Sequence, residues 1–411
     1  MTRPGTNDGR EMTVIESTMK QDDAPRLLLL GSEFPPGPGG IGTHAYQLAR
    51  HLARLGWSVR SLSPQSYVAT ETRDVFNRGQ EFGITPLPER DAGATWWAER
   101  ARLIHAAVRN HRPSLMVASG HRALWTAAAV GSLYRLPWVA IGHGSEFLSP
   151  SPVARFLTQR AIAGATAMIA VSEYTAGLIR AASRPRQLVV IHNAADGERF
   201  RPGTTEMTAA LRRKWNLGDA RVLLTVGQVG ERKAQDVVIR ALPRILAARP
   251  DTIYVMAGLP RQQSEFGALA AELGVADRVR FAGLLSDEEL PAAYQLADVF
   301  VLVSRRAADG DVEGYGIVVQ EAALCGVPAV VSRDCGLTEA IREGETGLSV
   351  PPDDSEATAA AVLALLDDEA RCQEMGRRAR EVAQAATWAE RAIAYDELLR
   401  SLLPPVSVGV R

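Results

Sequence analysis

Two glutamates, Glu313 and Glu321, frame the segment of this sequence that is best suited to chemistry. They end the run EGYGIVVQE, with seven residues between them, after a buried-strand pattern at 297–304 and before a second apolar run at 329–332. In a strand–helix–strand unit, the carboxyl end of the strand and the helix N-terminus face the ligand crevice and attract phosphate. Glu313 would lie in the loop and Glu321 in the helix, so one can bind a sugar while the other binds a nucleoside. The alternative is a surface glutamate and a solvated helix face.

Two cations, Arg232 and Lys233, lie in a loop that follows another strand pattern, within GQVGERKAQD at 227–236. Lysine is rare in this chain and occurs only as Lys20, Lys214 and Lys233. A lysine retained at the carboxyl end of a strand is a candidate point charge for a diphosphate. A solvated loop cation is the alternative.

A glycine-rich loop connects the first strand to the first helix. Gly37, Gly39 and Gly42 spell the GxGxxG pattern of dinucleotide-binding proteins. However, four residues separate the strand from the glycines, and the second strand ends without the acidic residue that would hold a ribose. We therefore favour a glycine loop whose N–H groups approach a donor diphosphate or an acceptor, and the family resemblance described below points to Gly39, Gly40 and Gly42. A tight turn without a ligand is the remaining alternative.

Two further patterns have weaker signals. His143 follows a strand and precedes a glycine in HGSE, so its ring can point into the crevice, although a histidine at a strand end is more often solvated or a capping group. Asp309 and Asp311 form a DxD triplet of the kind that binds metal in some glycosyltransferases, but no histidine or further carboxylate completes a site. We expect no metal and no cofactor.

These motifs together resemble the retaining glycosyltransferases of family 4, also called glycosyl transferases group 1, which carry two glutamates separated by seven residues on a GT-B fold. The resemblance covers residues 26–400, and the other segments that follow the order of the family are 35–59, 143–146, 189–203, 227–236, 278–290 and 344–354.

The resemblance implies a role for each charged residue. Glu321 would bind the ribose hydroxyls, and Lys233 and Arg232 would bind the diphosphate. Glu313 would bind hydroxyls of the transferred sugar, and His143 would orient that sugar and stabilise charge near its anomeric carbon. His143, Glu313 and Lys233 are thus the expected catalytic residues.

Backbone groups complete the implied donor site. N–H groups at Tyr315, Gly316 and Ile317 would meet the distal phosphate at the start of a helix. Gly227 and Gln228 would line the loop that carries the cations. The family usually has an arginine, its second diphosphate cation, where this chain has Gln228, so a neighbouring cation would have to compensate.

The implied activity is transfer of a hexosyl group from a UDP- or GDP-hexose to an acceptor hydroxyl, with retention of the anomeric configuration. The leaving phosphate oxygen would deprotonate the acceptor, so the enzyme needs no protein base on that face. Three alternatives remain: a GT-B phosphorylase, a nucleotide-sugar epimerase, and a catalytically silent protein that binds sugar nucleotides.

The chain of 411 residues is too long for one core and suits two domains. We expect an α/β protein of the GT-B type, with two Rossmann-like, doubly wound parallel-sheet domains facing a central cleft. Its parts would be a disordered leader (1–24), an acceptor-binding domain (25–195), a nucleotide-sugar-binding domain (196–385) and a C-terminal helix (386–411). That helix would cross back to the first domain, with Trp388 as its anchor.

Alternating apolar and amphipathic segments predict the elements of both sheets. We expect a first helix from an N-cap at Thr43 to Leu55. The expected strands are 26–32, 57–63, 115–119, 138–143, 167–172 and 188–193 in the first domain, and 221–227, 252–258, 278–283, 297–304, 329–332 and 348–352 in the second.

Charge is distributed unevenly along the chain. Residues 1–195 have a balance of +7 and the remainder −8, although the chain as a whole has a formal net charge of −1. The basic half could contact an anionic membrane surface or a phosphorylated acceptor, or it could simply be a solvated face. It has no dense basic run of the kind that binds nucleic acid. The absence of a secretory signal predicts a cytoplasmic protein.

Overall fold

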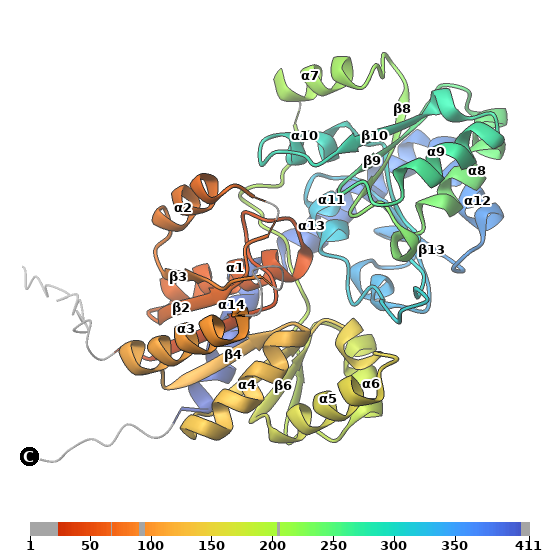
Figure 1. Cartoon of the computed structure of the whole chain (residues 1–411). Coiled ribbons are helices and arrows are strands. Elements are labelled where there is room, and N and C mark those ends of the chain that lie inside the picture. The colour runs from red at the N-terminus through yellow and green to blue at the C-terminus, as the bar shows by residue number, and fades with distance from the viewer. Residues whose placement is uncertain (1–23, 67, 90–94, 204–205, 404–411) are drawn as a thin grey trace, which may run out of the picture.

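Two parallel sheets form the framework of the protein in the computed structural model, which describes residues 24–66, 68–89, 95–203 and 206–403 (Figure 1). The first sheet has seven strands in the order β3-β2-β1-β4-β5-β6-β7, and the second has six in the order β10-β9-β8-β11-β12-β13. In both, the strand order reverses beside the first strand of the sheet. Right-handed crossovers then place helices on both faces.

The strands of the first sheet are apolar because both faces of a parallel sheet are covered. Leu27 to Leu30 on β1, an interior strand, are at most 2% exposed. The strands are β1 (Arg26–Gly31), β2 (Ser58–Ser63), β3 (Gly83–Pro86), β4 (Leu115–Ser119), β5 (Trp138–Gly142), β6 (Ala167–Ala170) and β7 (Leu188–Val190).

The second sheet follows the same rule, and every residue of its second strand, β9, is buried. Its strands are β8 (Arg221–Val226), β9 (Thr252–Ala257), β10 (Val279–Gly283), β11 (Val299–Leu302), β12 (Ala329–Ser332) and β13 (Gly347–Val350).

Helices connect the strands of each sheet. Those between strands of the first sheet are α1 (Gly40–Arg54), α2 (Thr70–Arg78), α3 (Trp96–His111), α4 (His121–Tyr134), α5 (Pro152–Gly164) and α6 (Glu173–Ala182). The others are α7 (Glu206–Lys214), α8 (Gln235–Ala248), α9 (Gln263–Glu272), α10 (Glu289–Leu296), α11 (Ile317–Leu324), α12 (Ser355–Leu366), α13 (Glu369–Gln384) and α14 (Trp388–Ser401).

All the strands expected from the sequence are present. Their ends agree within two residues, except that β7 ends at Val190, three residues before the expected end. The prediction for the first helix was wrong at its start, since α1 begins at Gly40 and its N-cap is Gly39, not Thr43. The hydroxyl of Thr43 instead donates to the Gly39 carbonyl oxygen from within the first turn. Strand β3 was not predicted, because its four residues include Gly83 and the proline Pro86.

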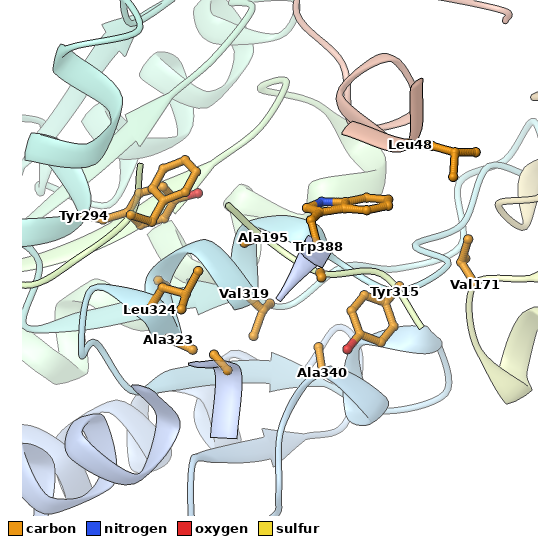
Figure 2. Packing of buried hydrophobic residues seen from close by; sticks show 14 of the residues in the cluster. Leu48, Val171, Ala195, Tyr294, Tyr315, Val319, Ala323, Leu324, Ala340 and Trp388 are labelled. Atoms are coloured by element: carbon orange, nitrogen blue, oxygen red, sulfur yellow. The ribbon is translucent and has the colours of Figure 1, made fainter. Parts of the chain in front are cut away.

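The last helix, α14, packs on α1 of the first sheet's layer. Trp388, its first residue, is 2% exposed and lies between Leu48 of α1 and Val319 of α11 (Figure 2). The hydroxyl of Tyr395 lies 3.0 Å from Nε2 of His44 on α1. Trp388 therefore packs against His44 of α1 and belongs to a hydrophobic cluster with members in both halves of the chain. The domain limits at residues 195 and 385 stay predictions.

The expected leader lies outside the described residues, except for its last residue. Within the ranges that the structure describes, no helix is both long enough and apolar enough to cross a membrane.

Candidate active site

The charged residues singled out in the second half of the sequence come together at the strand order reversal of the second sheet. Strands β8 and β11 are neighbours there, and their carboxyl ends open on the same side. The loop after β8 contains the short helix η2 (Glu231–Lys233), and the loop after β11 contains Glu313. In doubly wound sheets, ligands bind in the crevice at such a reversal point.

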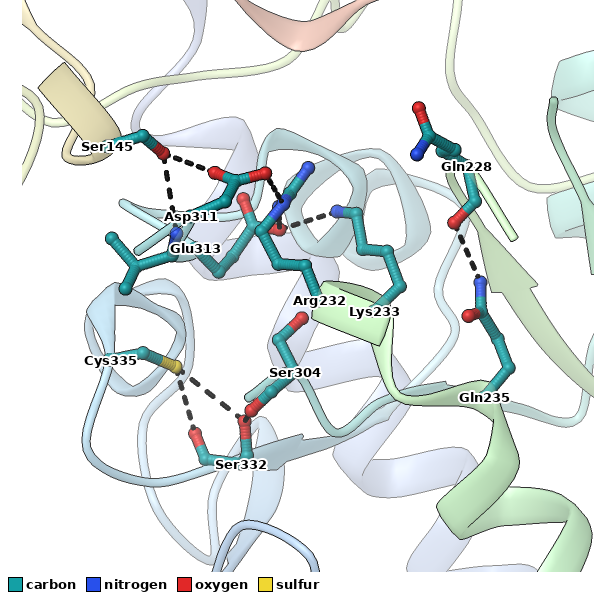
Figure 3. A network of polar contacts seen from close by, with 11 residues as sticks. Ser145, Gln228, Arg232, Lys233, Gln235, Ser304, Asp311, Glu313, Ser332 and Cys335 are labelled. Carbon is teal, nitrogen blue, oxygen red and sulfur yellow. Dashed lines mark hydrogen bonds and ion pairs between the residues drawn. The ribbon is translucent and has the colours of Figure 1, made fainter. Parts of the chain in front are cut away.

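Glu313 is the centre of an ion-pair cluster (Figure 3). Its Oε2 lies 2.5 Å from Arg232 Nη1 and 2.5 Å from Lys233 Nζ. Arg232 Nε also lies 2.8 Å from a carboxylate oxygen of Asp311. The cluster thus has two cations and two carboxylates, and Glu313 and Lys233 in it are 13% and 9% exposed in their side chains.

Burial and neighbouring charge act in opposite directions on this cluster. Burial raises the pKa of Glu313, but the charges of Lys233 and Arg232 outweigh it and bring that pKa to about 2. Burial lowers the pKa of Lys233, and the adjacent Arg232 lowers it further. Burial would also lower the pKa of Arg232, but Glu313 and Asp311 raise it overall. At Lys233 burial therefore outweighs the neighbouring carboxylates, whereas at Arg232 the direct contacts with both carboxylates outweigh burial.

The loop after β8 is shaped for the lysine. A Cβ atom at Gly227 would lie 2.8 Å from Lys233 Cε, so the glycine leaves room for the lysine side chain. Gln228 is exposed, and its carbonyl oxygen accepts a hydrogen bond of 3.1 Å from the side chain of Gln235 (Figure 3). The side chain of Gln228 therefore stands outside the ion-pair cluster, whereas Arg232 lies within it.

The N-terminus of α11 adjoins the cluster. Gly316 is its N-cap at φ +85°, a backbone conformation that favours glycine, and no side chain caps the helix there. Its first turn, which starts at Ile317, contains no acidic residue. The positive end of the helix dipole therefore remains available to an anion.

Glu321 lies within α11 and is only 7% exposed. Its Oε2 accepts a hydrogen bond of 2.6 Å from the hydroxyl of Tyr294 on α10. Burial raises the pKa of Glu321. The two glutamates of the E-x7-E motif are therefore held differently, Glu313 by cations and Glu321 by a tyrosine.

The loop after β5 carries His143, whose carbonyl oxygen lies beside Gly314 of the loop that contains Glu313. Its Nε2 lies 2.9 Å from the hydroxyl of Ser119, at the end of β4, and burial lowers the pKa of His143 to about 4. The carboxylate of Glu146 accepts hydrogen bonds from the N–H groups of His143 and Gly144, at 3.2 and 2.7 Å. Burial raises the pKa of Glu146 to about 7. Glu146 therefore fixes the backbone of the HGSE loop and His143 is neutral near pH 7.

The glycine-rich loop before α1 binds a side chain of the chain itself, the carboxyl group of Glu33. Oε1 of Glu33 accepts a hydrogen bond of 2.9 Å from the N–H of Gly42. A Cβ atom at Gly39 would lie 2.3 Å from the same oxygen, so glycine there admits the carboxylate. At Gly40, by contrast, an added Cβ would meet no atom within 4 Å. The Gly42 N–H is thus bonded within the chain, whereas the surface at Gly40 is open.

The loop after β11, which contains Glu313, contacts the first half of the chain. A Cβ atom at Gly314 would lie 1.8 Å from the carbonyl oxygen of His143, and Ser172 donates a hydrogen bond of 2.6 Å to the Gly314 carbonyl. Ser145 donates to the carboxylate of Asp311. The first glycine of EGYG therefore allows the two halves to meet closely.

Both aspartates of the DxD triplet have partners within the chain. Asp311 pairs with Arg232, and its N–H donates to Asp309 Oδ1 at 2.9 Å. Across the ranges that the structure covers, no group of three His, Cys, Asp or Glu residues is arranged to hold a metal ion.

Two family models match consecutive parts of the chain. The model of glycosyltransferase family 4 matches residues 38–199, and the model of glycosyl transferases group 1 matches residues 207–382. The GDP-mannose-dependent alpha-(1-6)-phosphatidylinositol monomannoside mannosyltransferase of Mycolicibacterium smegmatis is 32% identical over 400 residues, which span 91% of this chain and 98% of that protein. The chain belongs to glycosyltransferase family 4. A second relative, the D-inositol 3-phosphate glycosyltransferase of Corynebacterium diphtheriae, is 30% identical over 86% of this chain and 88% of its own length.

The GT-B fold of this family 4 glycosyltransferase is confirmed by solved structures. The Anabaena protein Alr3699/HepE in complex with UDP and glucose matches with a TM-score of 0.77 and 21% identity, over 92% of this chain and 100% of that chain. A sucrose-phosphate synthase from Thermosynechococcus elongatus matches with a TM-score of 0.73 and 22% identity, over 92% and 99%. At these identities the likeness establishes the fold alone.

Sequence reasoning about this glycosyltransferase missed several residues that the structure places at the site. Tyr294 gave no signal because it lies in an ordinary amphipathic helix. Glu33 was not predicted as a site residue. It lies before the glycines, and an acidic residue next to a glycine-rich helix start is a capping signal that could have indicated it. Glu146 was visible within HGSE, and its position three residues after His143 could have indicated a loop-fixing carboxylate.

Proposed function

We propose that this family 4 glycosyltransferase moves a hexosyl group from a nucleoside diphosphate sugar to an acceptor hydroxyl and retains the anomeric configuration. The observation that carries the proposal is the cluster of Glu313, Lys233 and Arg232 beside the uncapped N-terminus of α11. These groups supply two cations, a helix dipole and a carboxylate within one crevice. The cations and the helix dipole can stabilise a leaving diphosphate, and the carboxylate can accept hydrogen bonds from sugar hydroxyls.

Binding of a donor would exchange partners within the cluster. Arg232 and Lys233 both pair with Glu313, so an incoming diphosphate competes with that carboxylate for them. Once the cations bind the diphosphate, Glu313 can accept hydrogen bonds from sugar hydroxyls. Negative charge on the diphosphate grows as the glycosidic bond breaks, so the same cations stabilise the transition state more than the bound donor.

We propose retention because inversion would require a base opposite the leaving group, whereas the charged groups of this site gather around the diphosphate and the sugar. The departing phosphate oxygen, which gains charge on the face where the acceptor enters, takes the acceptor proton instead. His143 is neutral, so it contributes a hydrogen bond to the transferred sugar and not a charge. None of these groups requires a metal ion, and we propose that transfer is metal-independent.

GDP-mannose is the donor we propose, because the similar relatives from Mycolicibacterium smegmatis and Corynebacterium glutamicum are named as GDP-mannose-dependent mannosyltransferases. Both are named for acceptors that contain phosphatidylinositol, and the relative from Corynebacterium diphtheriae is named for inositol 3-phosphate. We therefore propose an acceptor hydroxyl on an inositol or a mannose unit.

The experiment has two stages. A thermal-shift panel of UDP- and GDP-sugars should single out GDP-mannose, since a ligand at a hundred times its dissociation constant stabilises the fold by about 2.7 kcal/mol. Transfer is then followed by mass spectrometry with phosphatidylinositol, a mannosylated phosphatidylinositol and inositol 3-phosphate as acceptors. A glycosidic product supports the proposal. Phosphorolysis or epimerisation without an acceptor would replace it with another reaction, and binding without turnover would indicate a silent protein.

We also propose that the first half of the chain touches an anionic membrane surface through α5. Three apolar residues of this helix, Val153, Phe156 and Leu157, are 68%, 60% and 41% exposed at a spacing that places them on one face. Arg155 and Arg160 are exposed on the same helix, which has no acidic residue. An exposed apolar face with basic neighbours suits the surface of an anionic bilayer.

Vesicle sedimentation tests this contact. The protein should bind vesicles that contain phosphatidylglycerol more strongly than vesicles of phosphatidylcholine alone. Phe156→Ser combined with Leu157→Ser should reduce that binding, whereas Leu133→Ser on α4, at a residue that is 75% exposed, should not. Equal binding by both variants would contradict the role of α5.

A further inference from the structure

Tyr294 and Glu321 form a buried pair between α10 and α11. The side chain of Tyr294 is fully buried and that of Glu321 nearly so. The hydroxyl oxygen of Tyr294 lies 2.6 Å from Glu321 Oε2, within the range of hydrogen bonds that a carboxylate strengthens by its charge. Figure 2 shows Tyr294 in the region of Leu324 and Ala323 of α11.

The tyrosine ring is held rigidly. It packs edge-on against Phe200 with 5.6 Å between ring centroids, and it lies 5.8 Å from the ring of Phe300 on β11. Burial raises the pKa of Tyr294, and the charge of Glu321 raises it further, so the hydroxyl keeps its proton. Tyr294 can therefore act towards Glu321 only as a donor with a fixed position.

The carboxylate is constrained on one side only. Among the residues that the structure describes, Tyr294 is the one hydrogen-bond partner of the Glu321 side chain. One oxygen is thus fixed by the tyrosine, and the other keeps its lone pairs for a further donor. A buried carboxylate with one satisfied oxygen is an acceptor set in a fixed direction.

We propose that Tyr294 is the positioning residue for ribose recognition. Its hydroxyl holds Glu321 in the orientation in which the second carboxylate oxygen accepts hydrogen bonds from the ribose hydroxyls of the donor nucleotide. The inference rests on the proposed function, because it requires Glu321 to meet a nucleoside. It goes further by assigning the selectivity for ribose over deoxyribose to a residue outside the E-x7-E motif.

The test compares the dissociation constants of GDP and 2′,3′-dideoxy-GDP by calorimetry. The wild-type protein should prefer GDP by about 5- to 30-fold, the ratio that corresponds to one or two well-placed hydrogen bonds. Tyr294→Phe keeps the ring but removes the donor, so the preference should fall to about threefold or less. Affinity for the dideoxy compound should change little, because that compound does not use Glu321.

Tyr254→Phe is the matched control. Tyr254 is also fully buried in the second half of the chain, and its hydroxyl lies 2.8 Å from the hydroxyl of Thr225. Loss of this hydroxyl removes a buried hydrogen bond of the same kind away from Glu321. The variant should keep the preference of the wild-type protein for GDP.

The pH dependence of GDP affinity distinguishes a positioning role of Tyr294 from a role in packing alone. The hydrogen bond from Tyr294 lowers the pKa of Glu321 against the effect of burial. Tyr294→Phe should therefore move the acidic limb of GDP affinity to higher pH, and Tyr254→Phe should leave it in place. Should Tyr294→Phe fail to fold, 3-fluorotyrosine in place of Tyr294 keeps the ring and makes its hydroxyl a stronger donor to Glu321. The acidic limb of GDP affinity should then move to lower pH, and an unchanged limb would contradict the role of Tyr294.

The outcomes separate this inference from the proposed function. If the wild-type protein binds no nucleoside diphosphate of the UDP and GDP series, the proposed function fails. If it binds GDP with a clear ribose preference and Tyr294→Phe keeps both that preference and the pH profile, the proposed function stands and the role of Tyr294 is wrong.

Discussion

The ammonium nitrogen of Lys233 lies 2.5 Å from Oε2 of Glu313, and both side chains are largely buried. The pair joins a loop after β8 to a loop after β11, across the reversal point of the second sheet. Buried opposite charges of this kind are strongly coupled, so removal of one leaves the other without its main partner. In this protein Arg232 also contacts Glu313, so the carboxylate keeps one cation when the lysine is lost.

Lys233→Ala should lower kcat far more than it weakens nucleotide binding. The lysine faces a charge that grows as the donor is cleaved, so its removal should reduce kcat by about 10²- to 10³-fold. The affinity for the nucleoside diphosphate should fall less, because Arg232 and the N-terminus of α11 remain. Steady-state kinetics and calorimetry on the same preparation measure both quantities.

Gln228→Arg is the companion variant for this prediction. It restores a cation where the family usually has one, and Gln228 is exposed, so the longer side chain has room. Activity should be equal to or above that of the wild-type protein. Wild-type turnover in Lys233→Ala would show that Arg232, or another cation, carries the role assigned to the lysine.

Glu321→Ala should weaken binding of the nucleoside diphosphate by about 1 to 3 kcal/mol, because ribose hydroxyls then lose their acceptor in a partly desolvated crevice. Calorimetric titration of GDP measures this directly, and the thermal unfolding of the variant shows whether it is folded. An unchanged affinity in a folded variant would remove Glu321 from the donor site.

His143 should remain neutral throughout the neutral pH range. Burial lowers its pKa from 6.5 to about 4, so between these values the unfolded chain binds a proton that the folded protein does not. This residue therefore makes the free energy of unfolding rise with pH from about 4 to 6.5. In NMR spectra, the ring signal that disappears in His143→Gln should titrate near pH 4. Titration near 6.5 would indicate a solvated ring that can carry charge at the site.

The sequence predicted the parts of the site that depend on strand and helix order. Lys233 and Glu313 follow strands of one sheet, and strand periodicity with the rule for reversal points is enough to bring them to one crevice. The pairing of Tyr294 with Glu321 could not be predicted, because it depends on how α10 packs against α11. The close approach of Gly314 to His143 depends on how the two halves meet, which no local pattern encodes.

Activity should persist in excess EDTA. We assign the stabilisation of the diphosphate charge to Lys233, Arg232 and the N-terminus of α11, and Asp311 already pairs with Arg232. Initial rates with and without the chelator, after dialysis, measure this. Loss of turnover that Mg²⁺ or Mn²⁺ restores would revive Asp309 and Asp311 as metal ligands.

Glu313→Gln should slow transfer severely without trapping a covalent intermediate. The variant removes the charge that pairs with Lys233, but Glu313 is not a nucleophile in the proposed mechanism. Intact-mass spectrometry of the wild-type enzyme during turnover with a slow donor should show unmodified protein. A glycosyl adduct on Glu313 would indicate double displacement instead.

Retaining transfer from a nucleotide sugar fixes the anomeric configuration of the fresh product, which can be measured. The protein is incubated with an α-linked donor and an acceptor, and the anomeric coupling of the new glycosidic bond is measured by NMR before any equilibration. We expect an α-linked product, because the charged groups of the site gather around the leaving diphosphate and the sugar, whereas inversion would require a base on the opposite face. A β-linked product would contradict it.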